Sequence, residues 1–135
     1  MPAYKHLSKE KANSILKQAD LSFAAESKHA LDGIVVMGSK DSIDRMFREP
    51  EPERRALLDT LAELSQPEAL DLVGIMYVGR GDYIDDESDR QQVLEALQAQ
   101  LDAFRAQGAE DLVSICAEKD LVFHEYLRKG LELLS

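Results

Sequence analysis

The sequence predicts an all-α protein in which residues 1–135 form a single domain, a non-repeating bundle of five or six helices. Three observations lead to this prediction. Apolar residues recur three and four positions apart over most of the chain, which is the period of an amphipathic helix. Capping and stop signals separate the periodic segments. Hydrophobic residues make up 44% of the chain, enough for a core that needs no disulfide or metal.

The first helix is expected from Ser8 to about Leu31. The Ser8 hydroxyl can accept a hydrogen bond from a free amide of the first turn, and Gly33 ends the helix. The apolar stripe of this helix consists of Ala12, Ile15, Leu16, Ala19 and Phe23.

The segment that follows is expected to connect the first helix to the second. Ile34–Met37 is apolar and could form one short strand, but a lone strand has no partner, so we expect an extended or buried connector. Residues 42–47 are expected to form one or two helical turns. Pro50 and Pro52 then interrupt the helical pattern, which is typical of a rigid surface loop.

The helical pattern resumes at Glu53 and leads to the most apolar part of the chain. Ser65 and Glu68 have the spacing of a capping box, in which each side chain bonds the backbone amide of the other residue. Residues 69–78 are apolar at eight of ten positions, so we expect the central helix of the bundle, buried on most sides. A buried strand over residues 72–78 is the alternative, because short apolar runs are ambiguous.

Two more helices are expected between the central helix and the C-terminal one. The first is long and amphipathic, begins at a second capping box formed by Ser88 and Gln91, and ends near Gly108. The second is short and apolar, and Cys116 lies on its apolar face.

The last helix is expected to reach the C-terminus with an unusually wide apolar surface. Val122 and Leu133 lie off its main apolar face, so this surface is wider than one core contact requires. Wide apolar patches usually meet a partner, and we therefore expect self-association as a homodimer.

The charge balance argues against two classes of partner. Lys and Arg total 16 against 26 Asp and Glu, which gives a net charge of −10. Proteins that bind nucleic acid or anionic membranes need a cationic surface, so we expect neither partner. The N-terminus is polar, no apolar stretch reaches 18 residues, and the single cysteine excludes an internal disulfide. We therefore expect a cytoplasmic protein.

Residues 71–82, which end in Gly-Arg-Gly-Asp, resemble the signature of a small bacterial family of unknown function. Members of that family carry an apolar helix closed by Gly-Arg-Gly-Asp, often with Trp where Tyr77 stands. The leucine-rich residues 126–134 are similar to the ending of the family. The resemblance covers about residues 53–135 and does not place residues 1–52, which are expected to form a helix and a loop. It implies a bacterial, helical protein without a particular activity.

The candidate site is the turn after the central helix, where Tyr77, Arg80 and Asp82 come together. Gly79 is expected to be the helix C-cap with a positive φ, and Gly81 gives the turn further freedom. In one interpretation Arg80 and Asp82 form an anion clamp or a site for proton transfer. In the other, Arg80 pairs with a nearby acid and Asp82 caps the next turn. An unpaired Arg80 in a pocket would favour the first interpretation.

No metal or cofactor is expected. Glu26 and His29 have the Glu-x-x-His spacing of helical di-iron sites, but the sequence holds no second copy of that motif. Asp120 and His124 share a helical face, and one such pair is more typical of a surface contact. The acidic run in residues 82–89 does not match a calcium loop: whether Asp82 or Asp85 is the first position, the sixth residue is not Gly and the twelfth is not Glu.

No catalytic or nucleotide-binding motif stands out, and Cys116 is expected to be a buried core residue. A nucleophilic thiol needs an electropositive, partly exposed setting, whereas Cys116 lies among apolar residues. We therefore expect a protein-interaction or regulatory module with a protein partner, and not an enzyme. The alternative is a small-ligand-binding or enzymatic domain with an anion site at Gly79–Asp82.

Overall fold

The computed structural model describes residues 4–31, 51–119 and 122–135, and these ranges contain six helices and no strand. This confirms the predicted all-α, single-domain bundle, and the alternative of a strand over residues 72–78 is wrong. The predictions for residues 34–37, for residues 42–47 and for Pro50 lie outside the described residues. The helices are α1 (Lys9–Leu31), α3 (Pro52–Ala62), α4 (Gln66–Arg80), α5 (Arg90–Phe104), α6 (Ala109–Glu118) and α7 (Phe123–Leu134).

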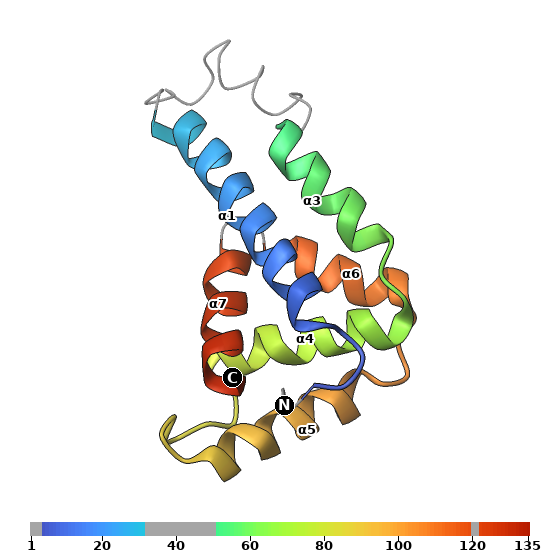
Figure 1. Cartoon of the computed structure of the whole chain (residues 1–135), viewed down its shortest axis with the longest axis vertical. Coiled ribbons are helices and arrows are strands. Elements are labelled where there is room, and N and C mark those ends of the chain that lie inside the picture. Colours follow the sequence, from blue (N-terminus) through green and yellow to red (C-terminus); the bar gives the residue numbers. More distant parts are fainter. Residues whose placement is uncertain (1–3, 32–50, 120–121) are drawn as a thin grey trace, which may run out of the picture.

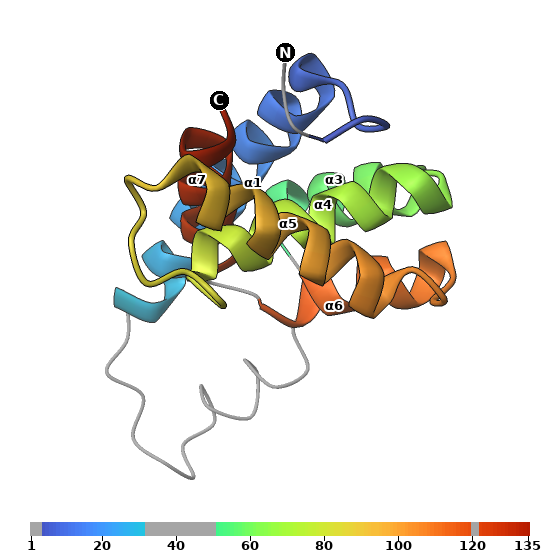
Figure 2. The same cartoon turned by 90° about the horizontal axis from the view of Figure 1, so that it is seen from below.

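Helix α4 is the centre of the bundle, as its composition predicts. It is contacted by α5, α6 and α7, while α1 packs along α3 and α7 (Figures 1 and 2). The helices α1 and α3 lie side by side and extend away from the rest of the molecule (Figure 1). No helix in the described ranges is long and apolar enough to cross a membrane. The fully buried apolar side chains of α4 are Leu72, Val73, Ile75, Met76 and Val78.

The start of α4 follows the predicted capping box. The Ser65 hydroxyl accepts a hydrogen bond from the Glu68 amide at 3.3 Å, and the Ser65 amide donates to the Glu68 carboxylate at 3.0 Å. The predicted cap of α1 is present too, because the Lys11 amide donates to the Ser8 hydroxyl at 3.0 Å. Local hydrogen bonding thus sets where these two helices begin.

Two predicted helix ends need correction. Gly79 is not the C-cap of α4: the helix continues to Arg80, and Gly81 caps it with a φ of 95°. The N-cap of α5 is Asp89 and not Ser88, because the Asp89 carboxylate accepts hydrogen bonds from the Gln91 amide at 3.0 Å and the Gln92 amide at 3.4 Å. The Ser88 hydroxyl instead donates to Asp86 at 2.6 Å, so it is not free to cap.

Gly79 serves a different purpose, which is the close crossing of α4 and α7. A Cβ atom at Gly79 would lie 1.7 Å from the Tyr126 carbonyl oxygen of α7. A Cβ atom at Gly130 of α7 would lie 2.0 Å from the Ile75 carbonyl oxygen of α4. The two helices therefore meet backbone to backbone at a pair of glycines, an approach that no larger residue permits.

The N-terminal segment is fixed to α4 by a buried carboxylate. Asp71 is 2% exposed, and its Oδ2 atom accepts hydrogen bonds from the His6 amide at 2.5 Å and the Leu7 amide at 2.9 Å. These bonds satisfy a charge that would otherwise be costly to bury, and they hold the side chains of Tyr4 and Leu7 in the core. The sequence pattern showed Asp71 only as a break in an apolar run.

We predict that Gly79→Ala lowers the free energy of unfolding by about 3 kcal/mol or more, because the new methyl group must displace the backbone of α7. Gly108→Ala is the matched control, since a Cβ atom there meets nothing within 4 Å. We expect it to cost about 1 kcal/mol or less, as is usual at a helix N-cap. Urea denaturation measures both variants. Equal denaturation midpoints for the two would contradict the crossing described above.

We also predict that an ion pair between α1 and α4 makes stability depend on pH. The Lys11 ammonium lies 2.6 Å from the Glu68 carboxylate, and this hydrogen bond, with those from Ser65, holds the pKa of Glu68 at about 2, below its usual 4.5. A depressed folded-state pKa means that the stabilisation is present above pH 4.5 and is lost as the pH falls toward 2. Glu68→Gln should therefore lower the unfolding free energy at pH 7 and lose its effect near pH 2.

The control for this pH dependence is Glu63→Gln, at an exposed glutamate just beyond α3. Thermal melts of the wild type and both variants between pH 2 and neutrality, at fixed salt, give the comparison. A Glu68→Gln effect of the same size at both ends of this range would contradict the prediction.

Candidate functional site

The predicted site after α4 is a local ion pair on the surface. The Arg80 Nε atom lies 3.7 Å from the Asp82 carboxylate, and the two side chains are 46% and 40% exposed. The guanidinium carbon of Arg80 is 5.9 Å from the centre of the Tyr77 ring. Exposed pairs of this kind contribute little stability, so the pair orders the turn without fixing the fold. Arg80 is therefore tied to a carboxylate, the arrangement that favours a structural turn.

Two residues distant in sequence complete the surroundings of Tyr77. The ring stacks on Phe104 of α5, with the two centres 5.4 Å apart and the planes nearly parallel at 4°. The Lys119 ammonium, just after α6, lies 5.2 Å from the centre of the same ring. Sequence reasoning missed both, because neither residue has a spacing relation to Tyr77. The aromatic stack and the two cations join the ends of three helices.

The prediction for His124 is wrong, and the prediction for Cys116 is confirmed. His124 is 6% exposed, and its Nδ1 atom has no hydrogen-bond partner among the described residues. Its ring stacks on that of Phe23, with the two centres 4.1 Å apart, so it is not the predicted surface residue. The described ranges contain no cluster of three potential metal ligands, whereas Asp120 and the His29 side chain lie outside them. Cys116 is buried as predicted, and burial raises the pKa of its thiol to about 12, which keeps it protonated and poorly nucleophilic.

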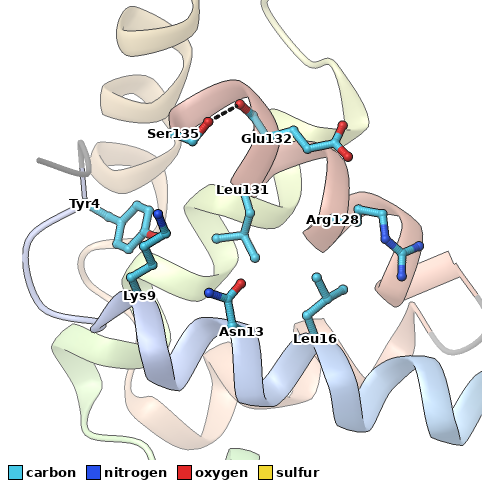
Figure 3. A pocket seen from close by; sticks show the side chains of 8 residues that line it. All are labelled: Tyr4, Lys9, Asn13, Leu16, Arg128, Leu131, Glu132 and Ser135. Carbon is cyan, nitrogen blue, oxygen red and sulfur yellow. Dashed lines mark hydrogen bonds between the residues drawn. The ribbon is translucent and has the colours of Figure 1, made fainter.

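A groove between α1 and α7 forms a cavity that could take a ligand. Its volume is about 430 Å³, within the range of sites that take small molecules or single side chains. Leu131 of α7 projects toward Leu16 and Asn13 of α1, and these residues form the middle of the groove (Figure 3). We call this cavity the α1–α7 groove; it is lined by Tyr4, Lys9, Asn13, Leu16, Arg128, Leu131, Glu132 and Ser135.

Contacts at both ends hold the walls of the groove in place. At one end the Arg128 guanidinium of α7 forms an ion pair and hydrogen bond with Asp20 of α1. At the other end the Arg90 guanidinium donates to the backbone carbonyl oxygens of Leu133 at 3.0 Å and Ser135 at 3.3 Å, which fixes the end of α7 to α5. Between these contacts α1 and α7 do not meet fully, and the groove lies in the gap.

The groove offers an apolar floor and free polar groups. Leu16 and Leu131 pack against the core on one side and remain half-buried. Within the described part of the chain, the exposed side chains of Lys9 and Asn13 have no hydrogen-bond or ion-pair partner. Burial, and the negative charge of Asp71, raise the pKa of the Tyr4 phenol, which stays protonated. The arrangement can hold an apolar group between the leucines and a carboxylate near Lys9.

Sequence reasoning did not single out this groove. One signal was available: the spacings of four and three place Lys9, Asn13 and Leu16 on one face of α1, which could indicate a shared surface. The facing residues Arg128 and Leu131 show the same spacing on α7. Nothing in the sequence indicates that these two faces meet incompletely.

A second cavity, of about 340 Å³, lies where the N-terminal segment crosses α4 and α5. Its polar lining includes Asp71, whereas Tyr77 and Arg80 line neither cavity.

Comparison with known proteins adds no relative: no protein-family description, curated protein or solved structure matches the chain.

Proposed function

We propose that the protein is an interaction module that binds an amphipathic segment of a partner protein in the α1–α7 groove. An apolar side chain of the partner enters between Leu16 and Leu131, and an acidic side chain pairs with Lys9. The observation that carries this proposal is the groove itself: an apolar floor beside a cation and an amide that have no partner among the described residues. Such a combination is typical of grooves that recognise short segments by one anchor and one charge.

The alternative is a ligand site at the turn after α4, built from Tyr77, Arg80 and Asp82. The geometry supports it less well. Neither of the two cavities described above is lined by these residues, and the Arg80 and Asp82 side chains are both exposed.

A peptide library displayed on phage and selected against the purified protein tests the proposal. We expect the selected peptides to share one large apolar residue with an acidic residue nearby. Asn13→Trp fills the groove and should weaken binding of these peptides by about 10-fold or more, which corresponds to about 1.4 kcal/mol. The matched control is Ser14→Trp, which places the same side chain on an exposed position of α1 that does not line the groove.

Two further measurements separate the competing sites. Arg80→Ala should leave peptide binding unchanged; a loss of binding in Arg80→Ala, with Asn13→Trp unaffected, would place the site at the turn and contradict the proposal.

Light scattering over a concentration series tests whether a second copy of the chain occupies the groove. The predicted homodimer requires a mass of about twice 15.1 kDa. If that dimer is lost in Asn13→Trp and kept in Ser14→Trp, the partner segment belongs to the protein itself.

A further inference from the structure

The smaller cavity combines an acidic wall, a basic rim and an apolar floor. It lies between the N-terminal segment, α4 and α5, and its volume is about 340 Å³. Four leucines supply the apolar surface: Leu70, Leu94, Leu97 and Leu101. Lys5, His6, Asp71, Gln98 and Arg105 supply the polar groups.

Asp71 is the buried acidic group of this cavity. Its Oδ2 atom accepts both backbone hydrogen bonds from the N-terminal segment, whereas Oδ1 receives no hydrogen bond from the described residues. Oδ1 is not among the fully buried atoms that lack a partner, so it is accessible at the wall of the cavity, where a charged donor would bind it best. The wall of the cavity therefore favours an ammonium group.

Lys5 and Arg105 are the basic groups at the rim. Both side chains are exposed, and Lys5 has no ion-pair partner among the described residues. The Arg105 guanidinium contacts Asp102 at 2.9 Å, but both members of that pair are 61% exposed, so the contact is weak and can be exchanged. The rim therefore favours a carboxylate, in a chain whose net charge of −10 otherwise repels anions.

The apolar surface sets the third requirement for a ligand. Leu94 is 39% exposed and Leu101 is half-buried, so both present apolar surface to a ligand in this cavity. A fatty acid would satisfy the leucines and the rim but would leave Asp71 without a donor. An alkylamine would pair with Asp71 but would leave Lys5 and Arg105 at the rim without an anion. A small molecule that carries an ammonium group, a carboxylate and an apolar side chain satisfies all three surfaces.

We propose that the cavity between the N-terminal segment, α4 and α5 binds a free apolar α-amino acid. The ammonium group of the ligand donates to Asp71, its carboxylate pairs with Arg105 and Lys5, and its side chain packs on the leucines. The site is separate from the α1–α7 groove, so the two proposals can fail independently.

Isothermal titration calorimetry with three related probes tests this inference. L-leucine should bind with one site per chain. L-leucinamide lacks the carboxylate and 4-methylpentanoate lacks the ammonium group, so each should bind about 10-fold more weakly or worse. Absence of leucine binding would overturn the proposal. Leucinamide that binds as tightly as leucine would also overturn it, because the cavity would then read an amine or a peptide N-terminus and not a free amino acid.

Two variants place the binding at this cavity without disturbing Asp71, which the fold needs. Arg105→Gln removes a rim cation and should weaken leucine binding by about 10-fold. Lys17→Gln is the control, since it removes one exposed cation of α1 that does not line the cavity. Equal affinities in both variants would overturn the assignment. Asn13→Trp in the α1–α7 groove should leave leucine binding unchanged, and weaker leucine binding in that variant would contradict the separation of the two sites.

Discussion

The backbone contact between α4 and α7 is the constraint on which the rest of the structure depends. Gly79 and Gly130 let the two helices approach so closely that a methyl group at either position would overlap a carbonyl oxygen of the other helix. Because α4 is buried along most of its length, this contact fixes α7 directly against the core. Gly74 opens another side of α4, where a Cβ atom would lie 2.9 Å from the Leu97 side chain of α5. Glycines thus set the distances of two neighbours from the central helix.

The positions of both cavities follow from this arrangement. With α7 held by α4 and its end tied to α5 by Arg90, α1 meets α7 through the Phe23–His124 stack and the Asp20–Arg128 pair, and the α1–α7 groove lies beyond them. The N-terminal segment then crosses α4, held by Asp71, and separates the groove from the smaller cavity. The N-terminal segment lines both cavities. Burial, and then the negative charge of Asp71 in the smaller cavity, raises the pKa of Tyr4 in the α1–α7 groove.

Much of the fold, and little of the site, could be predicted from the sequence. Periodicity and capping depend on residues close in sequence, so the Ser65–Glu68 capping box and the central helix could be predicted. The structure confirms both. Gly79 shows the limit: as an isolated glycine near a helix end it favours a C-cap, and only the close approach of α7 explains why the helix continues past it. Asp71, His124 and the groove depend on contacts between segments far apart in the chain, which spacing does not reveal.

Native-state amide hydrogen exchange, followed by NMR, tests the role of the α4–α7 crossing most directly. Backbone amides that the α4–α7 crossing protects from solvent should exchange only when the whole domain unfolds. We predict that the amides of residues 72–79 of α4 and 127–130 of α7 share the highest opening free energy, equal to that of global unfolding. If α7 exchanges through a lower-energy opening while α4 stays protected, the two helices are not one unit, and the crossing does not hold the structure together.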